Sequence, residues 1–232
     1  MQDIPVQLNA VVQALHDLVE PQIFKQVPVS PDTTALLLID IQHLLRAENY
    51  RDLIGLAGLP AGVGEALLQQ VDRNLGATLH NIQQLLVRCR VRGIRPIHIG
   101  LGAHLADGSD TGLLHTMAGV QNRPGMREIE FLPETAPLPG EIVLRKTCSG
   151  IHVGTGIDRL LRNLHIDSVI VTGFYTDQCI STSVRDLADL NYRVILPIDA
   201  VGALSPERHA NALQSLRVYA STESTQSLLD RI

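Results

Sequence analysis

The sequence predicts an α/β fold in which a doubly wound, mostly parallel, six-stranded sheet carries helices on both faces. Short apolar runs alternate with longer segments of helical periodicity over most of the 232 residues. A strand buried on both faces is apolar throughout, and residues 34–40, TALLLID, keep that pattern up to their last residue. Residues 167–200 contain a strand, a helix and a second strand in succession, and such βαβ units close with right-handed crossovers.

The other elements follow the same alternation along the chain. Residues 1–30 predict an N-terminal helical extension, which leaves a single domain over residues 31–232. Residues 101–140 are irregular and rich in Gly, Pro and His. The expected strands are 34–40, 94–100, 141–146, 167–173, 192–200 and 218–221, and the expected helices are 62–93, 155–166, 178–191, 206–217 and 222–231.

Composition narrows the classes of partner. The net charge is -5, no cluster of Lys or Arg occurs, Trp is absent and aromatic residues are 3% of the chain, so we expect neither a nucleic-acid nor a membrane partner. The sequence has no positively charged segment before an apolar stretch and no apolar run of membrane-spanning length, which favours a cytoplasmic protein. Its three scattered cysteines form neither a disulfide framework nor a metal-binding pair.

Three reactive side chains follow predicted strands, where ligands bind in such sheets. Asp40 and Lys146 each end a strand, and Cys179 lies in the first turn of the helix after residues 167–173. A helix N-terminus lowers the pKa of a thiol and binds anions. Each residue alone also has a structural interpretation, as a turn cap, a solvated strand end and a small buried side chain. Together they predict a carboxylate, an ammonium and a thiol in one cleft.

Three segments resemble the signatures of the isochorismatase-like cysteine hydrolases. Residues 35–42 read ALLLIDIQ, and residues 143–166 contain a Lys followed by Gly-Thr at the start of a helix. Residues 169–203 contain Gly-x-x-Thr-x-x-Cys, then a helix, then a strand that ends in Asp-Ala. Order and spacing agree over residues 33–229. The resemblance implies a sheet with Rossmann-type strand order.

The resemblance also implies a mechanism. Cys179 would be the nucleophile, Asp40 the general base, and Lys146 the residue that orients Asp40 and stabilises negative charge. A cis peptide between Phe174 and Tyr175 would direct the N–H groups of Tyr175 and Cys179 toward the oxyanion. The expected reaction is hydrolysis of a C–N bond in a small linear amide, ureido or carbamoyl compound, through a thioester, with release of ammonia or an amine and without a cofactor.

Departures from the family pattern leave the substrate open. Residues 47–60 lack the Asp-x-His cluster that binds metal in nicotinamidases, so no metal is expected. His98, His104 and His115 lack metal-ligand spacing and are expected on the surface or in the cleft. From their positions, the candidate residues for binding a small-molecule substrate are His43, His98, Phe174, Tyr175 and Gln214.

Two other functions stay open at this point. One is a vinyl-ether hydrolase that acts on isochorismate and does not depend on the cysteine. The other is a catalytically idle scaffold of the same fold. Relatives are commonly dimers or tetramers, so we expect a homo-oligomer, in which the extension could pack on a neighbouring subunit through Val6, Leu8, Val11, Val12 and Leu15.

Overall fold

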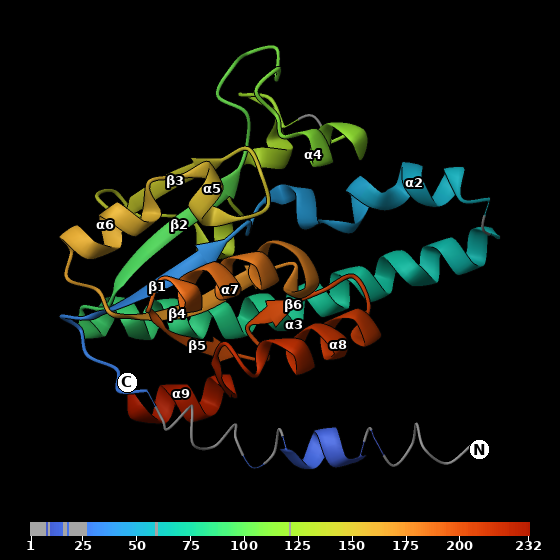
Figure 1. The fold of residues 1–232 in the computed structure, drawn as a ribbon. Coiled ribbons are helices and arrows are strands. Elements are labelled where there is room, and N and C mark those ends of the chain that lie inside the picture. The colour runs from blue at the N-terminus through green and yellow to red at the C-terminus, as the bar shows by residue number, and fades with distance from the viewer. Residues whose placement is uncertain (1–7, 9, 16–17, 19–26, 59, 121) are drawn as a thin grey trace.

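The computed structural model describes residues 8, 10–15, 18, 27–58, 60–120 and 122–232, and its centre is a parallel β-sheet (Figure 1). The strand order is β3-β2-β1-β4-β5-β7, and the short β6 pairs with β4. Every strand pair is parallel. The strands are β1 (Thr34–Ile39), β2 (Arg95–Leu101), β3 (Ile142–Lys146), β4 (Ser168–Phe174), β5 (Arg193–Pro197), β6 (Val201–Gly202) and β7 (Ser221–Glu223).

This sheet confirms the predicted fold class and differs from the prediction at its end. The two-residue β6 makes a seventh strand, which is too short for a hydrophobic pattern to reveal. The last strand is Ser221–Glu223 rather than 218–221. Tyr219 N and Ala220 N both donate to the carbonyl of Leu216, so residues 217–220 form the turn that ends the preceding helix.

Helices cover both faces of the sheet and divide the core into two halves. Alternate residues of β1 point to opposite faces, as the pleat of a strand requires. The helices are α2 (Arg51–Leu56), α3 (Ala61–Arg92), α4 (Leu113–Met117), α5 (Ile151–Gly154), α6 (Ile157–Asn163), α7 (Ser181–Asp189), α8 (Pro206–Leu216) and α9 (Thr225–Arg231). Ala35, Leu37 and Ile39 pack with α5, α6, α7 and α8, and Leu36 and Leu38 pack with α3 and α9.

The N-terminal segment is described only in part. Residues 8, 10–15 and 18 are helical, and Leu8, Val11, Val12 and Leu15 are exposed. Val6, which belongs to the same expected apolar face, lies outside the described residues. The extension and the domain boundary at residue 31 stay predictions. Within the part of the chain that the structure describes, no helix is both long and apolar enough to span a membrane.

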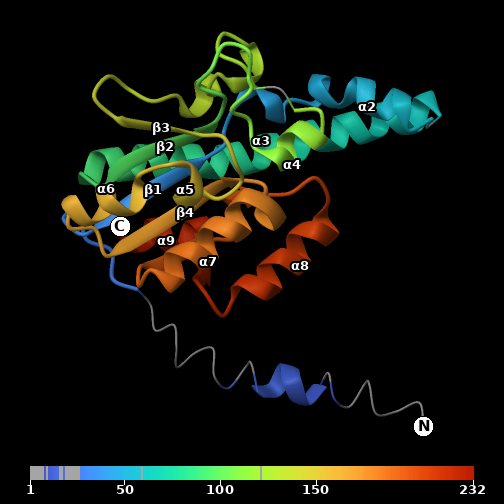
Figure 2. The same ribbon diagram turned by 45° about the horizontal axis from the view of Figure 1, so that its top comes forward.

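The direction of chain growth reverses between β1 and β4, the two central strands. From β1 the chain builds outward through β2 and β3 (Figures 1 and 2). It then crosses to β4 and builds outward through β5 and β7. Gly173 allows the two strands to approach here, because it has φ +118° and an added Cβ would lie 2.0 Å from the carbonyl oxygen of Ile39. Ligands of open α/β sheets bind beyond such a switch point.

Candidate active site

Asp40 follows β1 directly at the switch point. The residue is 4% exposed, and its N–H donates to the carbonyl of Ile99 at 2.8 Å. Its φ of +54° is in the left-handed region, which a non-glycine residue adopts rarely and often at functional sites. The chain therefore turns at Asp40 as it leaves the sheet.

Lys146, the last residue of β3, lies between the carboxylate and the thiol. It is 0% exposed although it carries a charge. Its ammonium donates to Asp40 Oδ2 at 2.7 Å, to the carbonyl of Cys148 at 3.0 Å and to Cys179 Sγ at 3.5 Å. An ammonium has three N–H donors, so all of them have protein acceptors. The positive charge is thereby fixed beside both other reactive groups.

Cys179 lies in a π-helical turn, Thr176–Ile180, that joins β4 to α7. Such turns are rare and occur often at functional sites. The peptide bond between Phe174 and Tyr175 is cis, at the position the resemblance implied. The carbonyl of Tyr175 then accepts from Gln178 N at 2.9 Å and from Ile180 N at 3.2 Å, which closes the turn around the cysteine. The structure therefore brings Asp40, Lys146 and Cys179, here called the candidate triad, into one site.

The thiol does not have the lowered pKa that its place at a helix start predicted. Burial and, next, the negative charge of Asp40 raise the pKa of Cys179 to about 12, and these effects outweigh the opposing effect of Lys146. Burial also opposes the charge of Lys146, but Asp40 and Cys179 overcome it and raise the Lys146 pKa. The resting site thus holds a neutral thiol beside a protonated lysine. Ionisation of this thiol near neutral pH would require a base.

The two carboxylate oxygens of Asp40 differ in their surroundings. Its Oδ2 accepts from Lys146, whereas its Oδ1 is buried and accepts no hydrogen bond from the described residues. A buried polar atom without a partner is costly in a folded protein, and active sites are among the places where it occurs. This oxygen is free to receive a proton.

The sequence did not identify the residues whose hydrogen bonds position the segments that carry the candidate triad. The buried side-chain amide of Gln42 accepts a hydrogen bond from the N–H of Leu101 at 2.8 Å and donates one to the carbonyl of Leu101 at 2.9 Å. These bonds connect the end of β1 to the end of β2. The hydroxyl of Thr176 bonds Nδ1 of His209 on α8 at 2.8 Å. Gln42 stands in the first signature segment and could have been suspected, but His209 is 33 positions from Thr176 and no local pattern connects the two.

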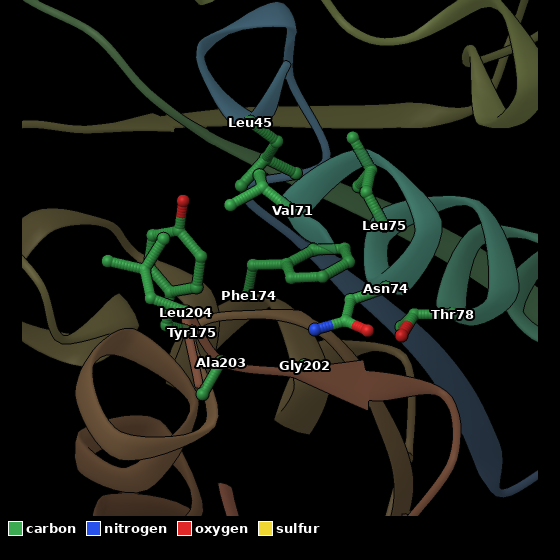
Figure 3. Close-up of a pocket in the computed structure, with 10 residues that line it drawn as sticks. All are labelled: Leu45, Val71, Asn74, Leu75, Thr78, Phe174, Tyr175, Gly202, Ala203 and Leu204. Atoms are coloured by element: carbon green, nitrogen blue, oxygen red, sulfur yellow. The ribbon is translucent and has the colours of Figure 1, made fainter. Parts of the chain in front are cut away.

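Phe174 and Tyr175, two predicted substrate residues, line a narrow pocket on the α3 side of the cis peptide (Figure 3). The Phe174 ring points toward Asn74 and Leu75 of α3, and the Tyr175 ring turns away from that helix (Figure 3). The Tyr175 hydroxyl contacts the hydroxyl of Tyr50. No residue of the candidate triad lines this pocket, so it adjoins the turn rather than surrounding the thiol.

The other three predicted substrate residues lie apart from one another. His43 is half-buried in the turn after β1 and borders a polar groove with Arg46 and Glu134. His98 is 1% exposed and bonds Glu141 at 2.9 Å, with Phe131 packed against its ring edge. Gln214 is exposed on α8, more than one turn past His209.

His98 and Gln214 therefore differ in position from the cleft residues we expected. His98 points to the α3 face of the sheet three residues before the end of β2, where it hydrogen-bonds Glu141 inside the protein, and burial lowers its pKa. Gln214 lies in the C-terminal half of α8, whereas His209, which bonds Thr176, lies in the N-terminal half. Among the residues that the structure describes, no cluster of three or more His, Cys, Asp or Glu side chains could hold a metal ion.

The chain is similar in sequence and in structure to known hydrolases and isochorismatase family proteins. Residues 34–227 match the family model of the isochorismatase domain. The ureidoacrylate amidohydrolase RutB of Rhizobium rhizogenes is 25% identical over 200 residues, which cover 78% of this chain and 75% of that protein. An isochorismatase family protein from Desulfovibrio vulgaris is 27% identical with a TM-score of 0.67, covering 86% and 97% of the two chains. A cysteine hydrolase from Pseudomonas syringae is 21% identical with a TM-score of 0.71, covering 89% and 95%.

Proposed function

Because this chain belongs to the isochorismatase family, a family of hydrolases, we propose that it is a cysteine-dependent amidohydrolase. Its substrate class is a small linear amide, ureido or carbamoyl compound, and the bond cleaved is a C–N bond other than a peptide bond. The observation that carries this proposal is the position of Lys146 Nζ, 2.7 Å from Asp40 Oδ2 and 3.5 Å from Cys179 Sγ. The name of the RutB relative supports an amide rather than an ether as the substrate.

The proposed mechanism begins with a neutral thiol, in keeping with its raised pKa. The Cys179 sulfur adds to the carbonyl carbon while the Asp40 carboxylate removes the thiol proton. The N–H groups of Tyr175 and Cys179 bind the oxyanion, and Lys146 stabilises the developing negative charge. Asp40 then donates its proton to the departing nitrogen, and ammonia or an amine leaves. Water, deprotonated by the same carboxylate, hydrolyses the thioester and restores the thiol.

The test is an ammonia-release screen over linear amides, ureas and carbamoyl amino acids with matched cysteine variants. Cys179→Ser is expected to lose activity by about 10³-fold or more, as nucleophile removal does in other hydrolases. Cys148→Ser is the control, because Cys148 is half-buried beside Lys146 and directs its sulfur to the carbonyl of Gly150 at 3.5 Å. Ammonia release that persists in Cys179→Ser would refute the thiol mechanism.

The variant Cys179→Ala and the same screen, extended to isochorismate, separate the other two functions. A vinyl-ether hydrolase would cleave isochorismate at nearly the wild-type rate after Cys179→Ala. A scaffold would release no ammonia in the screen and would not cleave isochorismate either.

A further inference from the structure

The short helix α4 is anchored next to the candidate triad. It lies beyond the carboxyl ends of β2 and β3 (Figure 1). Gly112, at its N-terminus, donates its N–H to the carbonyl of Thr147 at 2.9 Å, and Thr147 directly follows Lys146. An added Cβ on Gly112 would lie 2.8 Å from that carbonyl oxygen. The start of α4 is therefore held in close contact with the strand end that presents the ammonium.

The burial pattern of α4 is the reverse of an ordinary amphipathic helix. Leu113, Leu114 and Met117 are 74%, 68% and 78% exposed, whereas His115 is half-buried. A helix that packs on a core buries its apolar side chains. Here the imidazole takes the inward position, so burial of apolar surface does not explain the orientation of α4.

One nitrogen of the inward imidazole has no partner among the residues that the structure describes. His115 Nδ1 is buried and makes no hydrogen bond with the described residues. Burial and then the positive charge of Lys146 lower the pKa of His115, and the charge of Asp40 acts in the opposite direction. Both groups of the buried ion pair therefore act on this ring, and the lowered pKa favours its neutral form. A neutral imidazole presents one donor and one acceptor.

Within the described part of the chain, two buried polar atoms of residues that interact with Lys146 have no hydrogen-bond partner, Asp40 Oδ1 and His115 Nδ1. The three N–H donors of Lys146 are already used, so the ammonium has none left to bind a substrate carboxylate at this position. An uncharged carboxamide or ureido group has both N–H and C=O and could bond both a carboxylate oxygen and a neutral imidazole.

We propose that His115 is a substrate-binding residue, whose Nδ1 hydrogen-bonds an uncharged carboxamide or ureido group held between α4 and the candidate triad. This inference rests on the proposed function, because it assigns the polar group of the same substrate. It places the substrate-facing wall of the site on residues 112–117, in the stretch where the sequence showed only scattered histidines.

The test uses two alkylating probes of similar size, iodoacetamide and iodoacetate, which carry a carboxamide and a carboxylate. Labelling of Cys179 is followed by peptide mass spectrometry at pH 9 in a Cys148→Ser background. His115→Ala is expected to slow the iodoacetamide reaction about fivefold, the effect of one neutral hydrogen bond, and to change the iodoacetate reaction less. His115→Gln, which keeps a hydrogen-bonding group, should recover most of the rate.

The control is His104→Ala, a change at an exposed histidine in the same stretch, which should leave both rates unchanged. An equal change in the labelling rates of both probes in His115→Ala would indicate a merely structural effect and overturn the proposal. Unchanged rates in His115→Ala would overturn it as well. Neither result bears on whether Cys179→Ser loses ammonia release, so failure of this inference and failure of the proposed function are distinguishable.

Discussion

Lys146 and Asp40 form a buried ion pair in which Nζ and Oδ2 are 2.7 Å apart, with side-chain exposures of 0% and 6%. Removing two charges from water costs several kcal/mol per ion, and their attraction and hydrogen bonds offset this only while both partners are present. The pair joins the ends of β3 and β1, two strands that are not neighbours in the sheet. It therefore couples the stability of the fold to the geometry of the site.

This relationship predicts an asymmetric response to charge removal. Lys146→Met leaves the Asp40 carboxylate buried and unpaired, so we expect the free energy of unfolding to fall by about 3–5 kcal/mol. The double variant Asp40→Asn with Lys146→Met removes both charges and should recover much of that loss. Urea unfolding at pH 7 measures both.

The matched control is the exposed pair Arg51–Glu65, whose side chains are 64% and 52% exposed. Glu65→Gln should cost less than about 1 kcal/mol, since water screens such a pair. If Lys146→Met cost no more than Glu65→Gln, the buried pair would have no structural role.

The raised thiol pKa predicts how alkylation of Cys179 depends on pH. A thiol with a pKa of about 12 is almost fully protonated at pH 7, so its reaction rate with iodoacetamide should rise about tenfold per pH unit from pH 7 to 9 without a plateau. Asp40→Asn removes a negative charge that raises this pKa, so the variant should be alkylated several-fold faster at pH 8.

The same Asp40→Asn variant should lose amide hydrolysis, because it lacks the base that removes the thiol proton. Faster alkylation together with slower hydrolysis is the signature of a neutral thiol served by a general base. A plateau in the wild-type alkylation rate below pH 8 would instead show a preformed thiolate.

The fold could be predicted from the sequence because two kinds of hydrophobic pattern are visible in the sequence itself. The largely apolar runs at β1 and β4 identify strands buried on both faces, and the helical spacing predicted over residues 62–93 identifies α3, which spans Ala61–Arg92. Parallel strands put their carboxyl ends on one edge, so Asp40, Lys146 and Cys179 were expected to converge. What β1 and β4 could not reveal was the two-residue β6, whose pairing depends on the tertiary structure around it.

The details of the site depended on information absent from a one-dimensional pattern. The direction of a side chain across the sheet placed His98 on the α3 face with Glu141 instead of in the cleft. The thiol pKa depended on burial and on a carboxylate 139 positions away in the chain. Neither the side-chain direction nor the burial could be read from the sequence. The position of Cys179 at a helix start indicates only that the helix itself lowers the thiol pKa.

Gly173 predicts a test of the close approach between β1 and β4. Gly173→Ala would place a methyl group 2.0 Å from the carbonyl oxygen of Ile39, so the two central strands would have to separate. We expect a loss of more than about 4 kcal/mol in unfolding free energy, in the range of exceptional single substitutions. Loss of activity should accompany it, since Asp40 follows Ile39.

Gly125→Ala is the control that separates strain from collision. Gly125 also has a positive φ, +87°, but an added Cβ would meet nothing within 4 Å. Backbone strain alone should cost about 1 kcal/mol there. Equal losses in the two variants, measured by thermal or urea unfolding, would show that strain rather than contact with Ile39 sets the cost at Gly173.

Glu141 predicts a pH dependence of stability that is separate from catalysis. Burial alone raises its pKa, but hydrogen bonds from Arg90, the N–H of Leu138 and His98 outweigh burial and lower the pKa to about 2, from an ordinary value of 4.5. A carboxyl with a lowered folded-state pKa contributes stability above its unfolded-state pKa and loses it as pH falls through the folded value. The contribution is therefore complete above about pH 4.5 and disappears toward pH 2.

The variant Glu141→Gln should therefore be less stable than the wild type at pH 7, and the difference should shrink as pH falls below 4.5. A shift of this size corresponds to at most roughly 3.4 kcal/mol, which solvent screening at the half-buried site reduces to about 1–2 kcal/mol. Urea unfolding between pH 3 and 7 measures the difference, with the exposed Glu130→Gln as control. A difference that stayed constant over this range would mean that Glu141 acts through packing rather than through its charge.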